Sequence, residues 1–344
     1  MTTNPREQLL DLVQSHRVTA VIYVAARLGL AELLRDGPRT VEELASRTHA
    51  DRDALARLLV ALSTIGICSR VSEGRYLLTE LGAGLDGAAR RSFKNWVIFE
   101  GSMLTRRWDG LLDSIMSGKT ASQLQHVDDN FDLMARSPEH VRIFNEAMTD
   151  LTRLVTHDLL QAYDLGTISH LMDVGGGSGE LMSAVARAYP TIRGTVFDLP
   201  RCADAANQHF GHLGISGRVD FVAGDFFHAV PAVADAIILK SIIHDWDDER
   251  SRIILGNCRK ALPQKGRLLL VERAMPELPG TDDAGRSCAM SDLNMLRGPG
   301  GRERTEREYY RLLTESGFRA IAVYPAGRFN LIEAVFAEAV GNIR

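Results

Sequence analysis

The chain has 344 residues, of which 45% are hydrophobic and 24% are charged, and its formal net charge is −4. This composition excludes a mostly disordered chain, and the sequence contains no run of 18 apolar residues that would form a membrane-spanning helix. The N-terminus is polar and unlike a secretory signal, which predicts a cytoplasmic protein. Four widely spaced cysteines fit neither a zinc knuckle nor a CxxC redox pair, so they are predicted to be free thiols: Cys68, Cys202, Cys258 and Cys288.

The N-terminal hundred residues have the pattern of a winged helix. Residues 6–34 are predicted to be helical, and Thr40 with Glu43 forms a capping box that begins the next helix. A further helix follows Asp51, and residues 67–71 and 76–78 then form a hairpin. This outline has two interpretations, DNA binding and dimerisation. Residues 1–100 carry 13 Lys/Arg against 12 Asp/Glu, so they lack the basic surplus that a nucleic-acid partner requires, which favours dimerisation.

Residues 91–163 are predicted to continue as helices rich in large apolar side chains. Side chains of this kind at helical spacing usually pack in a core, and some of them would line an apolar substrate pocket. The pocket candidates in this stretch are Trp96, Phe131, Met134, Phe144 and Met148.

Strands and helices alternate after residue 165, which predicts a mostly parallel α/β sheet covered on both faces. The expected strands are 170–174, 193–197, 218–222, 235–240 and 266–272. The expected helices are 179–189, 201–211, 248–261 and 305–316. Two closing runs, 319–324 and 329–337, predict a terminal antiparallel hairpin.

A glycine-dense turn follows the first of these strands and has the pattern Asp-x-Gly-x-Gly-x-Gly, beginning at Asp173. Its spacing does not match the dinucleotide fingerprint, because Glu180 stands where a sixth-position glycine is needed. Asp173 suits a ligand with a positive amino or sulfonium group. Asp198 and Asp225 follow the next two strands, where they would meet a ribose and an adenine edge at the ligand-binding edge of the sheet.

These motifs resemble those of the class I S-adenosylmethionine-dependent O-methyltransferases of plant phenolics and of bacterial polyketides and antibiotics. The motifs are Leu171-Met-Asp-Val-Gly-Gly-Gly-Ser-Gly179, Phe197-Asp-Leu-Pro200, Gly224-Asp-Phe-Phe227, Leu239-Lys-Ser-Ile-Ile-His-Asp-Trp-Asp247 and Gly300-Gly-Arg-Glu-Arg-Thr305. The resemblance covers nearly the whole chain and implies a Rossmann-like methyltransferase fold, S-adenosylmethionine as cofactor and a homodimer with interlocked N-terminal helices. The predicted cofactor-binding residues are Asp173, Gly175, Gly177, Asp198, Leu199, Asp225, Phe226 and Lys240. Phe226 departs from the family pattern, in which many members have Met there.

The resemblance also implies three parts. Residues 1–100 would form a winged-helix-like dimerisation domain, residues 101–164 a helical linker that walls the substrate pocket, and residues 165–344 the catalytic domain.

His244 lies just beyond the fourth strand of the predicted sheet, at the same edge as the glycine turn. A phenol has a pKa near 10, so an imidazole within reach would help by taking its proton. Glu272 and Glu303 are the carboxylates expected to orient that imidazole, as in the resembled family. Other predicted substrate contacts are Asp245, Met290 and Asn294. Asp245 is also interpreted, with its neighbours Asp247 and Asp248, as a turn or capping residue. No metal is expected, although Asp292 and Asn294 would mimic a ligand pair.

Three functions follow from this interpretation. The first is O-methylation of a phenolic or hydroxylated aromatic natural product, with N-methylation as a close variant. The second keeps the fold and the cofactor but hydroxylates, decarboxylates or rearranges its substrate. The third, a small-molecule-sensing DNA-binding regulator, is disfavoured by the neutral N-terminal region. The sequence names neither the substrate nor the position that is modified, and no membrane partner is expected.

Overall fold

The computed structural model describes residues 4–71, 74–127 and 136–337, and the chain divides into two compact units. The first unit consists of Met1–Asp109 and Ser137–Leu151, and the second of Gly110–Arg136 and Thr152–Arg344. The long helix α12 (Pro138–Ala162) is shared between them. None of the helices in the described ranges combines the length and the apolar character that a membrane span requires.

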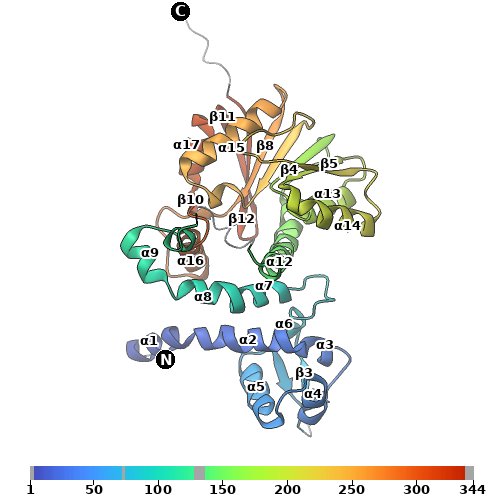
Figure 1. Ribbon diagram of the computed structural model, residues 1–344, viewed down its shortest axis with the longest axis vertical. Coiled ribbons are helices and arrows are strands. Elements are labelled where there is room, and N and C mark those ends of the chain that lie inside the picture. Colours follow the sequence, from blue (N-terminus) through green and yellow to red (C-terminus); the bar gives the residue numbers. More distant parts are fainter. Residues whose placement is uncertain (1–3, 72–73, 128–135, 338–344) are drawn as a thin grey trace, which may run out of the picture. The chain divides into compact units, whose positions relative to one another are not determined.

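The first unit is mainly helical and contains a small antiparallel sheet in the order β1-β3-β2 (Figure 1). Its elements before α12 are α1 (Pro5–Gln14), α2 (His16–Leu28), α3 (Leu30–Leu34), β1 (Arg39–Thr40), α4 (Val41–Thr48), α5 (Arg52–Thr64), β2 (Cys68–Arg70), β3 (Arg75–Leu78), α6 (Glu80–Ala83), α7 (Lys94–Phe99), the π-helix η2 (Glu100–Leu104) and α8 (Thr105–Trp108).

Local signals explain where these helices begin and end. The capping box of Thr40 and Glu43 begins α4, and the Asp51 side chain caps α5. The stretch 6–34 is helical, as predicted, but it forms three helices and not one. Gly29 lies in the left-handed region at φ +65° and ends α2, and Ser15 separates α1 from α2.

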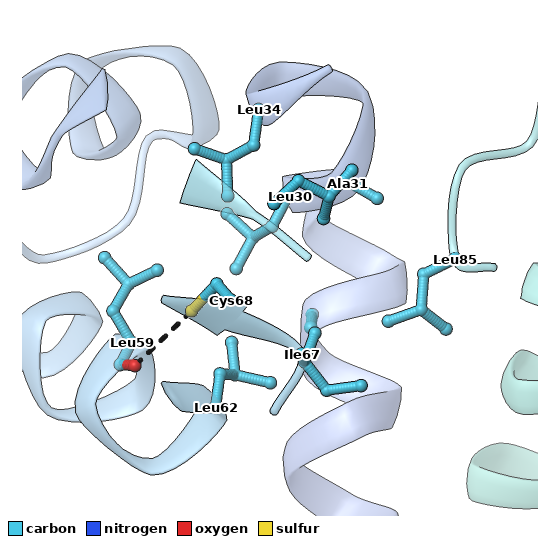
Figure 2. A pocket seen from close by; sticks show the side chains of 10 residues that line it. Leu30, Ala31, Leu34, Leu59, Leu62, Ile67, Cys68 and Leu85 are labelled. Carbon is cyan, nitrogen blue, oxygen red and sulfur yellow. Dashed lines mark hydrogen bonds between the residues drawn. The ribbon is translucent and has the colours of Figure 1, made fainter. Parts of the chain in front are cut away.

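The core of the first unit is formed by leucines from α3, α4 and α5 together with β2. Leu59, Leu62 and Cys68 are almost fully buried, and the Cys68 thiol lies 3.6 Å from the carbonyl oxygen of Leu59. Figure 2 shows these side chains around a small apolar pocket. The pocket is therefore a packing void of the core. All four cysteines are free, as predicted.

The second unit is built on a seven-stranded sheet in the order β11-β12-β8-β7-β4-β5-β6 (Figure 1). Its strands are β4 (His170–Val174), β5 (Arg193–Asp198), β6 (Val219–Ala223), β7 (Ala236–Lys240), β8 (Arg267–Glu272), β11 (Phe318–Ala326) and β12 (Phe329–Phe336). The first five are parallel, whereas β12 pairs antiparallel with both β8 and β11. The predicted fold class, a mostly parallel sheet with a terminal antiparallel hairpin, is confirmed.

Helices cover both faces of this sheet because its strand residues alternate between two cores. One face packs on α12, α13 (Glu180–Ala188) and α14 (Ala203–Leu213), and the other packs on α15 (Asp248–Ala261) and α17 (Glu306–Glu315). In β8, Leu269 and Val271 belong to the first core, whereas Leu268 and Leu270 belong to the second. This two-residue period is that of a strand buried on both faces.

Several smaller elements complete the second unit. They are α9 (Leu111–Ser117), α10 (Ala121–Leu124), the 3-10 helices η3 (Pro200–Cys202) and η4 (Ile243–Asp245), β9 (Ala274–Met275), α16 (Asp283–Arg297) and β10 (Arg304–Thr305). The helix α16 and the parallel pair β9–β10 were not predicted from the sequence.

Candidate active site

The glycine turn lies between β4 and α13, at the carboxyl edge of the sheet. Gly175, Gly177 and Gly179 all have positive φ, at +76°, +57° and +76°. A Cβ on Gly175 would lie 2.4 Å from Ile242, whereas a Cβ on Gly177 would meet nothing within 4 Å. The turn therefore presents bare backbone to open space at Gly177, where a ligand can approach closely.

Asp198, at the end of β5, ties this turn to the neighbouring strand. Its carboxylate accepts hydrogen bonds from the backbone N–H of Gly177 at 2.8 Å and of Leu199 at 2.6 Å. Burial raises the pKa of Asp198, while these two hydrogen bonds oppose the rise. A carboxylate has about four acceptor positions, so this one still has capacity for ligand hydroxyl groups.

Asp173 lies beneath the turn at the end of β4 and is almost completely buried. Its Oδ2 has no hydrogen-bond partner in the described part of the chain, and burial raises its pKa to about 7. Lys240, which ends the adjacent strand β7, opposes that rise, and burial lowers the pKa of its own amine. An unpartnered buried carboxylate indicates a site that a cationic or hydrogen-bond-donating ligand completes.

Asp225 and Phe226 follow β6 at the same edge. The Asp225 carboxylate accepts a hydrogen bond from the backbone N–H of Phe227 at 2.8 Å and lies 3.1 Å from Nδ1 of His228. A Cβ on Gly175 would lie 3.7 Å from the Phe226 ring, so this ring borders the glycine turn. Its centroid is 6.2 Å from that of Trp246.

His244 occupies the turn η4 after β7 and is surrounded by carboxylates. Its Nδ1 lies 3.2 Å from Oε1 of Glu303 and 3.8 Å from Oε2 of Glu272. Its Nε2 lies 3.6 Å from Oδ1 of Asp245. The backbone N–H groups of Ile242 and Ile243 donate to Oε1 of Glu272, at 3.1 and 2.8 Å. The structure thus brings together all three residues predicted to carry the proton chemistry.

The carboxylates decide the charge of this imidazole. Burial alone would lower the pKa of His244, but Glu272, Asp245 and Glu303 outweigh it and raise that pKa to about 10. Burial raises the pKa of Glu272 to about 7. The hydrogen bond from His244 overcomes burial at Glu303 and lowers the pKa of that carboxyl. His244 and Glu303 therefore form a charged pair at neutral pH.

The helix α16 supplies the next layer of contacts. Its Ser291 hydroxyl donates to Oε1 of Glu303 at 2.6 Å, and its Asp292 carboxylate accepts from the backbone N–H of Glu303 at 2.9 Å. Asn294 lies one helical turn after Ser291, on the same face of α16, and Met290 is exposed. Two of the predicted substrate contacts thus lie on the helix that holds Glu303.

The other predicted pocket residues do not all belong to this unit. Trp96, Phe144 and Met148 lie in the first unit, where the rings of Trp96 and Phe144 each pack against Phe99. Phe131 and Met134 lie outside the described residues. Within the described ranges, no three His, Cys, Asp or Glu side chains are grouped as metal ligands would be.

Comparison with known proteins identifies the family. The O-methyltransferase domain matches residues 108–319, which is more than half of the chain, and the O-methyltransferase dimerisation domain matches residues 10–85. The chain belongs to the O-methyltransferase domain family. It is a methyltransferase, and its cofactor is S-adenosylmethionine.

Two curated relatives and one solved structure illustrate the range of this family. The phenazine O-methyltransferase PhzM of Lysobacter antibioticus is 38% identical over 95% of this chain and 95% of its own. The 8-amino-8-demethylriboflavin N,N-dimethyltransferase of Streptomyces davaonensis is 32% identical over 90% of this chain and 89% of its own. Human N-acetylserotonin methyltransferase in complex with SAM superposes with a TM-score of 0.89 at 27% identity, covering 98% of this chain and 99% of that one. Relatives thus include both O- and N-methyltransferases.

The residues at the sheet edge fit S-adenosylmethionine. The cofactor has cationic amino and sulfonium groups, two ribose hydroxyl groups and an adenine ring. The edge offers the unpartnered carboxylate oxygen of Asp173, the acceptor capacity of Asp198, the bare backbone at Gly177 and the ring of Phe226.

The sequence did not indicate the contacts that Ser291, Asp292, Arg304 and Asp248 make near this site. Asp248 was interpreted as a turn or capping residue, but the N-cap of α15 is Asp247, whose side chain accepts from the backbone N–H of Arg250. Ser291 lies on a helix that was not predicted. Arg304 follows Glu303 directly, but an arginine is expected on the surface unless a buried partner is known.

Proposed function

We propose that this methyltransferase transfers a methyl group from S-adenosylmethionine to a hydroxyl group of an aromatic natural product, with His244 as general base. The observation that carries this proposal is the 3.2 Å contact between Nδ1 of His244 and Glu303, at the same sheet edge as the glycine turn. A carboxylate on one ring nitrogen makes the other a stronger base.

The tautomer follows from that contact. An Nδ1–H group that donates to Glu303 leaves the lone pair of the neutral imidazole on Nε2. His244 would take the hydroxyl proton at Nε2 while the hydroxyl oxygen bonds to the methyl carbon and the methyl–sulfur bond breaks. Glu303 then stabilises the imidazolium that forms. When bound, S-adenosylmethionine supplies an electrophilic methyl group on a cationic sulfur.

We assign the cofactor contacts by the charge and position of the residues around the glycine turn. Asp198 would accept from the ribose hydroxyl groups, Asp173 would face the cationic end, and Phe226 would cover the adenine. The complete proposed set is Asp173, Gly175, Gly177, Asp198, Leu199, Asp225, Phe226 and Lys240.

We propose that the substrate contacts are the residues predicted for them. Three of these belong to the second unit: Asp245, Met290 and Asn294. The other proposed contacts are Trp96, Phe131, Met134, Phe144 and Met148.

We propose a homodimer formed through the first unit. The match to a dimerisation domain and the apolar surface of α1 support it. No residue of α1 is buried, although the helix carries Leu9, Leu10, Leu12 and Val13. The winged-helix description of this unit also stays a prediction.

The experiment is to incubate the enzyme with S-adenosylmethionine and a panel of hydroxylated aromatic compounds. A product heavier by about 14 mass units, one CH₂, with one S-adenosylhomocysteine released per product, is the expected result. A product heavier by about 16 units, or one rearranged at constant mass, would indicate another reaction on the same fold. Asp198→Ala is the control, because it should weaken cofactor binding and leave the imidazole intact.

N-methylation is the second candidate, because a relative 32% identical to this chain is named an N,N-dimethyltransferase. A neutral amine or a pyridine-type ring nitrogen attacks through a lone pair that is already present, so it needs no base before attack. The same panel should therefore include nitrogen acceptors that match the hydroxylated compounds in size. Methylation of the nitrogen acceptors alone, at a rate that His244→Ala does not change, would favour this candidate over the first.

A further inference from the structure

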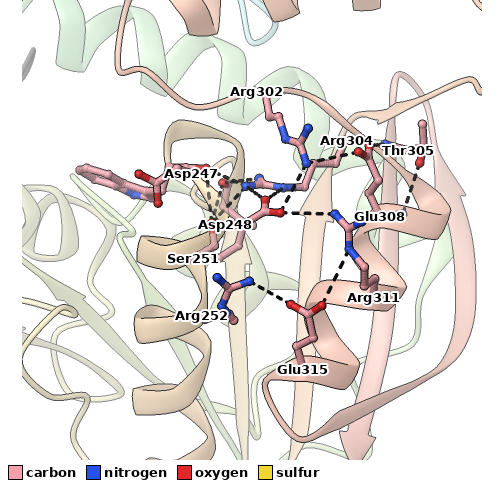
Figure 3. A network of polar contacts seen from close by, with 12 residues as sticks. Asp247, Asp248, Ser251, Arg252, Arg302, Arg304, Thr305, Glu308, Arg311 and Glu315 are labelled. Atoms are coloured by element: carbon pink, nitrogen blue, oxygen red, sulfur yellow. Dashed lines mark hydrogen bonds and ion pairs between the residues drawn. The ribbon is translucent and has the colours of Figure 1, made fainter.

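Arg304 is fully buried in the second unit, next to Glu303 in the chain. A buried guanidinium needs a counter-charge and hydrogen-bond acceptors. Oδ1 of Asp248 supplies the counter-charge, at 3.0 Å from Nε and 2.8 Å from Nη2. Figure 3 shows Arg304 next to Asp248 and Ser251. Nη1 and the second hydrogen of Nη2 remain for other acceptors.

The acceptors that it holds lie on both sides of His244. Nη1 donates to the carbonyl oxygen of Ile243 at 2.9 Å, and Nη2 donates to the carbonyl oxygen of Trp246 at 2.8 Å. Ile243 precedes His244, and Trp246 follows it by two residues. The guanidinium thus fixes the turn η4 at both ends, while the neighbouring Glu303 contacts the imidazole.

The pairing of β10 with β9 links Arg304 to a second contact with the same turn, which Glu272 makes. Arg304 in β10 pairs with Ala274 in β9, two residues after Glu272. Glu272 accepts from the backbone N–H groups of Ile242 and Ile243. One short parallel pair therefore sets both carboxylates against His244, and Arg304 lies at its start.

We propose that Arg304 is a positioning residue that sets the distance between the His244 imidazole and the Glu303 carboxylate. This inference rests on the proposed role of His244 as base. Arg304 acts through the backbone of η4, and nothing in the proposal requires it to touch substrate or cofactor. An arginine is needed here because its planar guanidinium donates in several fixed directions, towards three separate acceptors. The ammonium group of a lysine, on a flexible side chain, does not reproduce this geometry.

Arg311 provides a matched control, because it meets the same Asp248 without reaching the turn. Its Nη2 lies 3.4 Å from Oδ2 of Asp248, the oxygen that Arg304 does not use, and its side chain is 56% exposed. Arg311→Lys and Arg304→Lys therefore make the same chemical change at two arginines that share one carboxylate. They differ in burial and in whether the carbonyl contacts to η4 are lost.

The test measures the imidazole directly as well as the rate. The pKa of His244 is followed by NMR in protein with labelled histidine, with His244→Gln identifying the resonance. In Arg304→Lys we expect this pKa to fall towards its ordinary value, because the contact with Glu303 lengthens. We expect kcat to fall by about 10–10²-fold, since small misplacements of a reacting group have costs of that order. The Kd for S-adenosylmethionine should stay within about twofold, and Arg311→Lys should match the wild type.

An unchanged His244 pKa in a folded Arg304→Lys protein, or equal losses in both lysine variants, would overturn the proposal. If Arg304→Lys does not fold, Asp248→Asn loosens the same guanidinium and should lower the His244 pKa in the same direction; no change there would also overturn it. The NMR titration needs no acceptor substrate. A wild type that methylates nothing would therefore contradict the proposed function, while the titration still tests the role of Arg304.

Discussion

His244 is held as an imidazolium at neutral pH, because three carboxylates raise its pKa to about 10. The raised pKa of the imidazole is closer to that of a phenol, near 10, which favours proton transfer from a phenol to neutral His244. His244 can accept a proton from the substrate only after its imidazolium has released one. A bound sulfonium cation adds positive charge to this edge and would lower the pKa of His244, which favours the neutral base when cofactor is present.

This charge distribution predicts the pH dependence of the reaction. kcat/KM reports ionisations of the free enzyme, so it should rise with pH along a limb whose pKa lies above the ordinary histidine value of about 6.5. Glu303→Gln removes a carboxylate that stabilises the imidazolium, which lowers the pKa of His244. Its limb should therefore move to lower pH, with a reduced plateau.

Glu315→Gln is the control for this pH profile, because the same substitution there removes a half-exposed carboxylate that pairs with Arg252 and Arg311. If the rising limb of the kcat/KM profile stays in place in Glu303→Gln, or moves equally in both variants, the His244–Glu303 pair does not set the pH dependence.

At the residue scale, the sequence predicted which side chains gather but not what holds them. His244, Glu272 and Glu303 could be named because they follow strands or belong to a family motif. Arg304 and Ser291 could not, because their contacts depend on the β9–β10 pair and on α16. Neither element has a periodic apolar pattern of its own. The proton-chemistry roles themselves stay predictions.

At the element scale, a glycine can be required for its left-handed backbone alone or also for the space that it leaves to a ligand. Gly177 and Gly214 both have positive φ, at +57° and +67°, and a Cβ on either would meet nothing within 4 Å. Gly214 only ends α14, whereas Gly177 lies in the turn and donates to Asp198. The two glycines therefore share a backbone requirement and differ in their surroundings.

We predict that Gly177→Ala and Gly214→Ala each lower the free energy of unfolding by roughly 1–2 kcal/mol, the cost of a left-handed alanine. Only Gly177→Ala should also weaken S-adenosylmethionine binding, by at least about tenfold, because its methyl group occupies the open face of the turn. Chemical denaturation and titration calorimetry measure the two effects. Equal cofactor affinity in both variants would place the cofactor away from Gly177.

The strands were predictable because short apolar runs bounded by turn residues are typical of buried strands. The predicted range 170–174, for example, is that of β4. The helix α16 was not predictable, because it begins with polar residues and includes Gly285. What starts it is the Asp282 side chain, which accepts from the backbone N–H of Gly285. The break at Gly29 was missed because apolar spacing continues across it.

At the scale of the whole molecule, the exposed apolar surface of α1 is the feature that a single chain leaves unexplained. Leu12 and Val13 are 62% and 64% exposed, and the matched dimerisation domain begins at residue 10. Apolar surface of this kind is typical of an interface between chains.

We therefore predict that the protein has twice the mass of one chain in light scattering or sedimentation. Leu12→Glu should reduce that mass towards a monomer, because it places a charge in the interface. Leu278→Glu is the control, since Leu278 is 90% exposed in the second unit and the variant should remain a dimer. A wild type that is monomeric at micromolar concentration would contradict the proposed assembly.

The most direct measurement compares His244→Ala with the wild type for cofactor Kd by calorimetry and for kcat with a methylated hydroxyl acceptor. We predict a kcat lower by roughly 10²–10⁴-fold, the usual contribution of a general base, and a Kd within about twofold of the wild-type value. Normal turnover by His244→Ala, or a wild type that does not bind S-adenosylmethionine, would contradict the account.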